Sequence, residues 1–361
     1  MQSRQPGIDL LRCLGLLFVT GVHSFLYNGY YYEPQMGILM WGANSFKWLF
    51  FTCNGLFMLL TGYLKCEKPL SKGYYRSLLP ILVGYGLTCL VSFPIRHFVL
   101  NEKLTIWQWL EKMVTFGNYA WYIEMYIGLF LIIPFLNGAY HSLENKKQKL
   151  ILLGTMLFLT ALPSVVNIFV FDSYAFWAQP VKEWEYTKII PSFFTVLYPV
   201  TYYFLGCFIR EFKPKLNALL NAFLIIALAF AFGSFNFYRS RGAYFVSGIW
   251  QEWGALPNVI MTVLVFIFLL NLPSDRLPNP IKTALSHISD LTLGGYLLSY
   301  IFDQYFYEKL NAKVEVVTDR IVYFVPMVAV VAIFSLLLSL AVNLLYNAIR
   351  RIFKPKRKTE Q

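Results

Sequence analysis

Charged residues are scarce in this sequence. They make up 14% of its 361 residues, whereas 57% are apolar and 19% are aromatic. A soluble domain carries about 25% charged residues, so the composition excludes an ordinary soluble enzyme and predicts a polytopic membrane protein. In a soluble protein the net charge of +12 would suggest a nucleic-acid partner. Basic loops explain that charge in a membrane protein, and we expect no nucleic acid.

The sequence also lacks the patterns that mark metal and nucleotide sites. Its five cysteines show no CxxC spacing and mostly fall in apolar stretches, so we expect neither a metal site nor a disulfide. No glycine-rich phosphate loop or Walker motif is present. We find no internal repeat, which weighs against the inverted-repeat architecture of many secondary transporters. The first apolar stretch has no small-x-small cleavage site, and we expect it to be retained.

Ten apolar stretches are each long enough to cross a bilayer, which takes about 20 residues. They predict an all-α, polytopic membrane domain over residues 1–349, followed by a basic cytoplasmic tail over 350–361. Basic residues gather in every second connection, as the positive-inside rule requires of an even number of spans. Both termini are therefore predicted to be cytoplasmic. The predicted spans are residues 7–29, 44–64, 78–95, 121–139, 150–170, 190–209, 217–237, 255–272, 286–307 and 321–347.

The first predicted span carries two ionisable side chains, Arg12 and His23. Eleven residues turn a helix about 20° past three full turns and rise about 16 Å, so both side chains face one side at different depths. A charge at the bilayer centre costs about 2.5–3.5 kcal/mol, which makes such a residue a candidate for function. Asp9 is within reach of Arg12 for an i,i+3 ion pair that would orient the guanidinium.

The chemistry of these side chains leaves alternatives open. His23 could take a proton from an attacking hydroxyl or form a structural hydrogen bond between helices. Arg12 suits a phosphate, carboxylate or thioester-bearing ligand, or a structural pair with Asp9. Glu124 is the only acid of the fourth span, and it could be protonated, paired with an arginine, or the catalytic partner of His23. Asp303 is predicted near the outer end of the ninth span, where solvation is easy.

Basic and aromatic segments flank this candidate site. Residues 65–76 hold four basic side chains, including Lys72 and Arg76. They could bind the phosphates of a coenzyme A thioester or serve only to set the topology. The long outer connections are aromatic, which is typical of an interfacial belt and also of a surface that guides a sugar acceptor. These connections are residues 28–42, 171–189 and 238–254.

Several segments together resemble the acyltransferase-3 family of integral membrane acyltransferases, especially its Gram-positive-like members. The resemblance covers nearly the whole chain, and its most specific element is an arginine followed by ten residues and a histidine, here Arg12 and His23. The segments are GIDLLRCLGLLFVTGVHS (7–24), LFMLLTGYL (56–64), YYRSLLP (74–80), WYIEMYIGLFLIIPFL (121–136) and ISDLTLGGYLL (288–298).

The resemblance implies a transmembrane O-acyltransferase in the bacterial cytoplasmic membrane. Such an enzyme moves an acyl group, commonly acetyl, from cytoplasmic acyl-CoA to a hydroxyl of an extracytoplasmic or lipid-linked glycan. Acyl-CoA would be a co-substrate rather than a permanently bound cofactor. Membrane lipid, the carbohydrate acceptor and a separate extracytoplasmic transferase would be its partners. From the residues and the resemblance together, we predict catalytic roles for His23, Arg12 and Glu124, donor binding by Arg12, Lys72 and Arg76, and support from Asp9, Trp121, Tyr122 and Tyr296.

Two positions depart from the family pattern. Gly73 stands first in the usual RxxR before the third span, and Ser299 stands where many relatives have a histidine. Direct transfer and a two-step covalent route both stay open. The alternative functions are an exporter or flippase of a polysaccharide or lipid-linked substrate, in which Arg12 and His23 would bind substrate or relay protons, and a non-catalytic subunit of a wall-synthesis complex.

Overall fold

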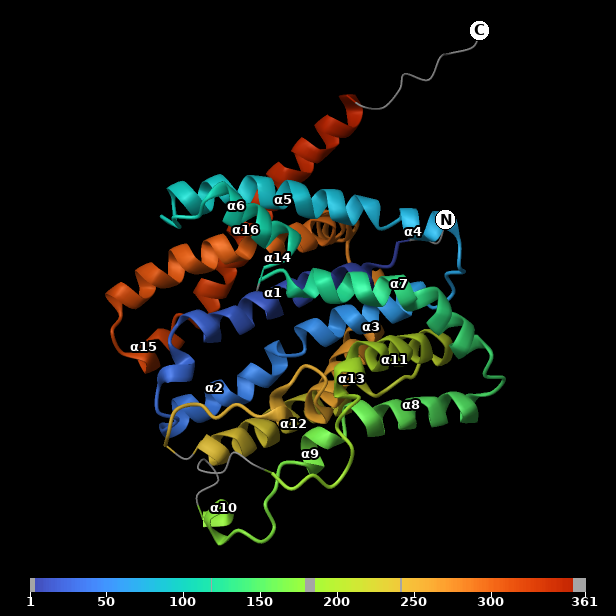
Figure 1. Ribbon diagram of the computed structural model, residues 1–361, viewed down its shortest axis with the longest axis vertical. Helices are drawn as coiled ribbons and strands as arrows, with labels where there is room; N and C mark the ends of the chain where they lie inside the picture. Colours follow the sequence, from blue (N-terminus) through green and yellow to red (C-terminus); the bar gives the residue numbers. More distant parts are fainter. Residues whose placement is uncertain (1–3, 118, 179–185, 241, 353–361) are drawn as a thin grey trace.

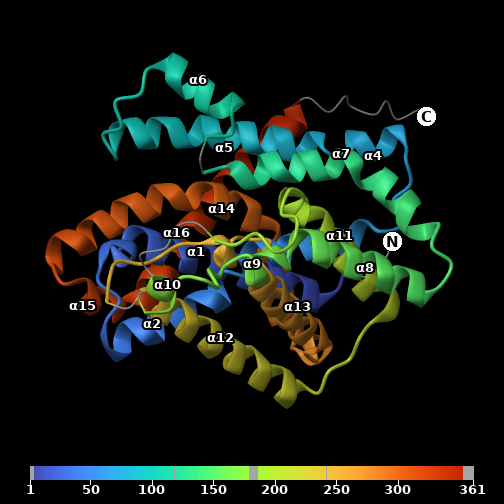
Figure 2. The same ribbon diagram turned by 60° about the horizontal axis from the view of Figure 1, so that its bottom comes forward.

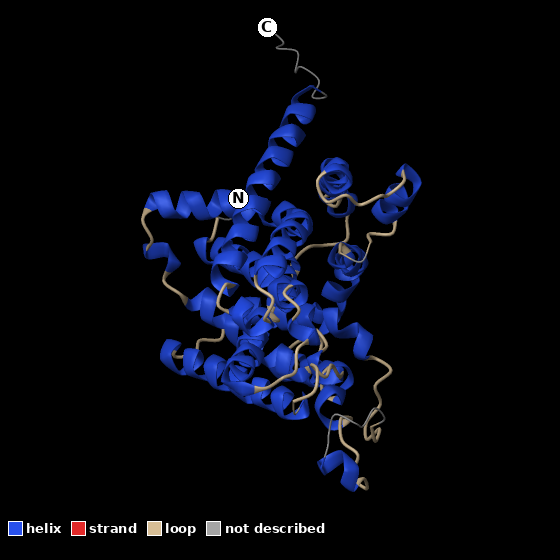
Figure 3. Cartoon of the chain, turned by 90° about the vertical axis from the view of Figure 1, so that its left-hand side faces the viewer, coloured by secondary structure: helices blue, strands red, loops and turns tan. Residues whose placement is uncertain are grey.

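The protein is described by a computed structural model that covers residues 4–117, 119–178, 186–240 and 242–352. These residues form helices and connecting loops without a strand (Figure 3). The predicted all-α class is therefore confirmed. The long helices stack across the bundle, with α5 (Leu79–Phe98) and α14 (Asn279–Lys313) toward one side and α8 (Lys146–Thr160) and α12 (Ala218–Ser240) toward the other (Figure 1).

Six segments in the described residues are long and apolar enough to cross a membrane, as expected for a multi-pass membrane protein. The other four predicted spans contain α3 (Cys53–Lys65), α8, α11 (Tyr198–Phe212) and α14. The first three of these helices are short, and α14 carries several charged residues. The count of ten spans and the cytoplasmic placement of the termini stay predictions. The six segments are Pro6–Tyr32, Lys72–Phe98, Trp121–His141, Ala218–Ser240, Ile249–Arg276 and Phe324–Arg350.

Helix α1 (Pro6–Tyr27) lies at the centre of the bundle. It begins at Pro6, whose missing N–H costs nothing in the first turn of a helix. Its buried residues include Leu11 and Leu16, and it packs against α2 (Gly37–Phe50), α3, α14 and α16 (Phe324–Ile352). This packing turns the face that carries Arg12 and His23 toward α14.

The second predicted span is broken into two helices. Helix α2 ends at Phe50 and α3 begins at Cys53. At the break, the Thr52 hydroxyl donates to the Leu49 carbonyl over 2.7 Å, and the Phe51 ring stacks on Trp253 with centroids 4.0 Å apart. A threonine hydroxyl that bonds a nearby carbonyl competes with the helical pattern. The apolar composition of residues 44–64 does not reveal this break.

Some aromatic side chains of the outer connections are buried in contacts with other aromatic residues. Tyr30 contacts Phe25, Tyr31 and Phe245, and its side chain is fully buried. Trp250 is also buried, and its indole N–H donates to Asn236 over 3.0 Å. These contacts explain part of the aromatic content by packing, whereas Tyr32, Tyr174 and Tyr244 are exposed. Part of the connection 171–189 lies outside the described residues.

Close approach of α3 and α11 depends on Gly62 and Gly206. A Cβ added at Gly62 would overlap the backbone oxygen of Tyr203, and one added at Gly206 would overlap the backbone oxygen of Leu59. We expect Gly62→Ala to lower the free energy of unfolding by about 1–3 kcal/mol, since a packed backbone cannot yield as a side chain does. Thermal unfolding in detergent measures the effect. Gly154→Ala on α8 is the matched control, because nothing lies within 4 Å of its added Cβ. Equal melting temperatures for the two variants would contradict the prediction.

Candidate active site

His23 forms a pair with Asp303 of α14. The Nδ1 atom of His23 lies 2.8 Å from Oδ2 of Asp303, whose side chain is 0% exposed, while that of His23 is 14% exposed. Asp303 is therefore not solvated as the sequence suggested. When Nδ1–H donates to the carboxylate, Nε2 keeps its lone pair. Within the described chain Nε2 has no hydrogen-bond partner, so this atom is available to take a proton.

Tyr119 completes the cluster. Its hydroxyl lies 3.2 Å from His23 Nδ1, donates to Asp303 Oδ2 over 3.4 Å, and is hydrogen-bonded to the hydroxyl of Ser299. The Tyr296 hydroxyl donates to the Tyr119 carbonyl over 2.6 Å, and the two rings stack with centroids 5.7 Å apart. Tyr119 belongs to the loop before α7 (Trp121–His141), where no periodicity marks it, and its partners are distant in sequence.

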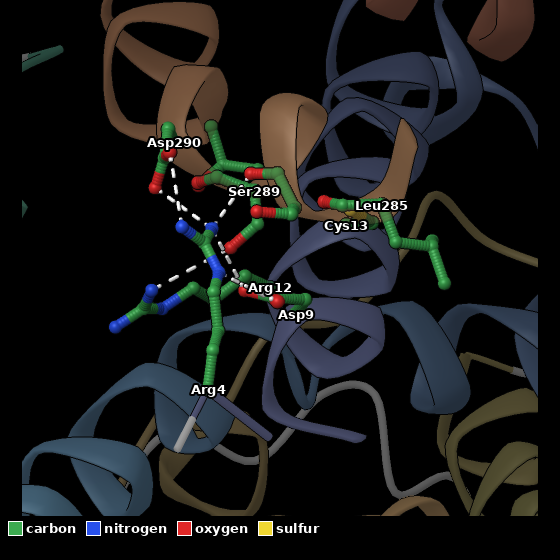
Figure 4. A network of polar contacts seen from close by, with 9 residues as sticks. Arg4, Asp9, Arg12, Cys13, Leu285, Ser289 and Asp290 are labelled. Atoms are coloured by element: carbon green, nitrogen blue, oxygen red, sulfur yellow. Dashed lines mark hydrogen bonds and ion pairs between the residues drawn. The ribbon is translucent and has the colours of Figure 1, made fainter. Parts of the chain in front are cut away.

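Arg4, and not Arg12, holds Asp9. The Arg4 guanidinium donates to Asp9 over 2.9 and 3.1 Å and to Asp290 of α14 over 2.9 Å, which joins the first turn of α1 to α14 (Figure 4). These bonds, first to Asp9 and then to Asp290, raise the pKa of Arg4 above its ordinary value. The ion pair predicted between Asp9 and Arg12 is not formed. Arg12 instead lies 3.5 Å from the hydroxyl of Ser289.

A cavity of about 350 Å³ opens beside Arg12, and we call it the Arg12 cavity. Lys65, at the end of α3, also lines it, with Nζ 4.9 Å from the centre of the Phe130 ring. Neither Arg12 nor Lys65 pairs with a carboxylate in the described chain. Asp290 lines the cavity too, and it shares the Arg4 guanidinium with Asp9. Arg12 and Lys65 therefore give the cavity an excess of positive charge.

A second cavity, of about 730 Å³, lies under α6 (Ile106–Val114), and we call it the α6 cavity. Helix α6 is at the edge of the bundle beside α5 (Figure 2). Tyr119 lines this cavity, as does Arg96 of α5. Arg96 pairs with Glu102 over 2.6 Å and lies 4.6 Å from the centre of the Tyr300 ring. Its charge is thus compensated, unlike that of Arg12.

The two cavities approach His23 from opposite directions along α1. On α1, His23 is one helical turn after Val19, which lines the Arg12 cavity, and one turn before Tyr27, which lines the α6 cavity. The same division recurs on α5, on α14 and across the start of α7. Ile81, Tyr122 and Tyr296 line the Arg12 cavity, whereas Tyr85, Ala120 and Leu297 line the α6 cavity.

The structure brings together only some of the predicted site residues. Arg12, Tyr122 and Tyr296 share one cavity, and His23 lies one helical turn beyond Val19, which also lines it. Glu124 is exposed and has no contact with His23; Asp303 occupies the place predicted for it. Trp121 stacks on Trp253 at 5.9 Å, outside both cavities. Lys72 and Arg76 lie on α4 (Lys72–Arg76), exposed and away from the cavity lining.

Sequence patterns pointed to the basic segment but not to Lys65 within it. Lys65 ends helix α3, whose buried face is visible in the sequence as an apolar run. Lys65 follows Thr61 by one helical turn, and both residues line the Arg12 cavity. This spacing was the signal in the sequence that could have identified Lys65.

Comparison with known families agrees with this arrangement. A family model described as an acyltransferase domain, that of the acyltransferase-3 family, matches residues 5–340, nearly the whole chain. No match was found among curated proteins or among solved structures. The matched region contains Arg12, His23 and Asp303 together with both cavities. The chain belongs to the acyltransferase-3 family and is a membrane acyltransferase.

Proposed function

We propose that this protein is an O-acyltransferase that moves an acyl group, acetyl in the first instance, from cytoplasmic acyl-CoA to a hydroxyl of an extracytoplasmic or lipid-linked glycan. The observation that carries the proposal is the His23–Asp303 pair, in which His23 lies on α1 between the linings of two cavities of different charge. A separate extracytoplasmic transferase could then pass the acyl group on to a polymer.

The Arg12 cavity suits the donor. Its uncompensated Arg12 and Lys65 favour an anionic ligand, and the phosphates of coenzyme A are such a ligand. A volume of about 350 Å³ is too small for the whole coenzyme but accepts its thioester arm. Lys72 and Arg76 are exposed near the same end of α3 and would extend the positive surface for the nucleotide part.

The His23–Asp303 pair suits proton transfer between the two substrates. His23 Nε2 takes the proton of the acceptor hydroxyl while the hydroxyl oxygen attacks the thioester carbonyl. The new C–O bond forms, the C–S bond breaks, and the imidazolium returns the proton to the leaving thiolate. Asp303 holds the ring through Nδ1 and stabilises the transient imidazolium, as a carboxylate does in a catalytic triad.

Loss of either cation of the Arg12 cavity tests the donor site. We expect Arg12→Ala and Lys65→Ala each to raise KM for acetyl-CoA about 10- to 100-fold, because a hydrogen bond to a charged group contributes about 1.5–3 kcal/mol. Initial rates at varied acetyl-CoA in reconstituted vesicles give the measurement. Lys68→Ala is the matched control: Lys68 belongs to the same basic segment but is exposed and does not line the cavity. The donor assignment fails if Lys65→Ala behaves like Lys68→Ala.

An exporter or flippase is the second candidate, because two cavities in line also resemble a path across the bundle. In that case His23 and Arg12 would bind the passing substrate. The Tyr119 ring, which lines the α6 cavity, stacks on the Tyr296 ring, which lines the Arg12 cavity, and this stack weighs against an open path. Uptake of a labelled glycan without acyl-CoA would favour this candidate.

A further inference from the structure

The acceptor requires a site that reaches His23 from the side opposite the donor. Besides the Arg12 cavity, two cavities are candidates: the α6 cavity and one of about 520 Å³ lined by Lys188, Thr195 and Glu252. Only the α6 cavity includes Tyr119, whose hydroxyl is 3.2 Å from His23 Nδ1. The lining of the 520 Å³ cavity contains no residue of the His23 cluster. Proximity to the His23 ring therefore selects the α6 cavity.

The charge of the α6 cavity indicates a neutral ligand. Arg96 is paired with Glu102, and the adjacent Glu111 and Lys112 on α6 carry opposite charges. The Arg12 cavity, by contrast, has two cations that pair with no carboxylate, Arg12 and Lys65, while its one carboxylate, Asp290, is bound to Arg4. An anionic ligand gains attraction in the Arg12 cavity and none in the α6 cavity. The two cavities thus separate an anionic substrate from an uncharged one.

The walls of the α6 cavity combine flat aromatic rings with hydrogen-bonding groups. Trp109, Tyr85 and Tyr300 supply the rings, while Thr88 and Gln108 supply polar atoms. A sugar has a matching surface, because its C–H faces pack on aromatic rings and its hydroxyl groups bond polar side chains. Helix α6 closes the cavity with Trp109, which is 6% exposed, and turns Trp107, which is 76% exposed, away from it.

We propose that the α6 cavity is the binding site for a neutral saccharide and that α6 is its roof, with Tyr119 positioning the reacting hydroxyl beside His23. This assignment rests on the proposed function, because the saccharide would be the acceptor of the proposed acyl transfer. The sugar could belong to a glycan chain or to a lipid-linked precursor, which present the same hydroxyl groups.

Cys89 gives a readout that is independent of catalysis. It lines the α6 cavity, is only partly buried and forms no disulfide. The experiment follows alkylation of Cys89 by N-ethylmaleimide in the purified full-length protein, quantified by peptide mass spectrometry. The probes are methyl glycosides of glucose, galactose, mannose and N-acetylglucosamine, with methyl glucuronide as the anionic comparison. We expect at least one neutral glycoside to slow alkylation about tenfold at about ten times its Kd, and methyl glucuronide to protect less.

A matched pair of variants on α6 tests the roof. Trp109→Leu should abolish protection and raise the acceptor KM about tenfold, Trp109→Phe should restore part of both, and Trp107→Leu should leave them unchanged. Thr195→Ala tests the 520 Å³ cavity and should also have no effect. Stronger protection by a dodecyl glucoside than by the methyl glucoside would assign the sugar to a lipid-linked source, and equal protection would assign it to a glycan.

The outcomes separate this assignment from the proposed function. Protection of Cys89 by neutral glycosides without any acyl transfer supports the saccharide site and contradicts the proposed acyltransferase activity. Acyl transfer without protection by any glycoside overturns the saccharide site and leaves the enzyme. Protection that survives Trp109→Leu, or a raised acceptor KM in Thr195→Ala, also overturns it.

Discussion

Replacing His23 with alanine should lower kcat for acyl transfer about 10²- to 10⁴-fold, the usual contribution of a positioned general acid–base group. The imidazole is the one titratable side chain between the linings of the Arg12 and α6 cavities with a nitrogen free of hydrogen bonds in the described chain. Removal of the ring takes away the imidazole nitrogen that accepts the proton of the attacking hydroxyl. Steady-state transfer of labelled acetyl measures the loss.

Donor affinity should survive the same change. His23 does not line the Arg12 cavity, so Kd for acetyl-CoA in His23→Ala should stay close to that of the wild type. His287→Ala is the control for loss of a histidine, because His287 is exposed on α14. His23 would have no catalytic role if His23→Ala transferred acetyl at the wild-type rate. The same would follow if its affinity for acetyl-CoA fell by the same factor as its rate of transfer.

Asp303→Asn should have the second largest effect, a fall in kcat of about 10²- to 10⁴-fold. The amide of asparagine can donate to His23 Nδ1, which would place the imidazole proton on Nε2 and remove the lone pair that accepts a proton. Size and packing hardly change, so the variant should fold. Measurements of kcat and of the melting temperature on the same samples separate the effect of the changed His23 tautomer from an effect on protein stability.

Glu124→Gln tests which carboxylate is the catalytic partner of His23. The sequence suggested Glu124, whereas the fold indicates Asp303. Glu124 is exposed and does not contact His23, whereas Asp303 lies 2.8 Å from Nδ1. We expect Glu124→Gln to retain most of the activity that Asp303→Asn loses. The reverse result would return the role of partner to Glu124.

Helical periodicity predicted the position of Arg12 and His23 well. Eleven residues bring both side chains to one face, and in the fold that face meets α14. The burial of Asp303 was not predictable in this way. It depends on the register between α1 and α14, which places Asp303 opposite His23 and Ser289 opposite Arg12. A single sequence shows where a helix is apolar but not which residue of another helix it faces.

The partner of Asp9 illustrates the same limit at short range. The i,i+3 rule selected Arg12 because both residues belong to the helix. Arg4 precedes the helix, and its long side chain folds back over the first turn to reach Asp9 and Asp290 together. Two carboxylates attract this arginine more strongly than one attracts Arg12. Arg12 is thereby left free of a carboxylate and can serve an anionic ligand.

The most direct test of the acyltransferase assignment is transfer of labelled acetyl from acetyl-CoA to a saccharide acceptor in reconstituted vesicles, with wild type, His23→Ala and Asp303→Asn at matched amounts of folded protein. We expect labelled acceptor with the wild type, and label reduced at least about 10²-fold in both variants. Equal labelling by all three proteins, or none by the wild type when donor and acceptor are both bound, would contradict it.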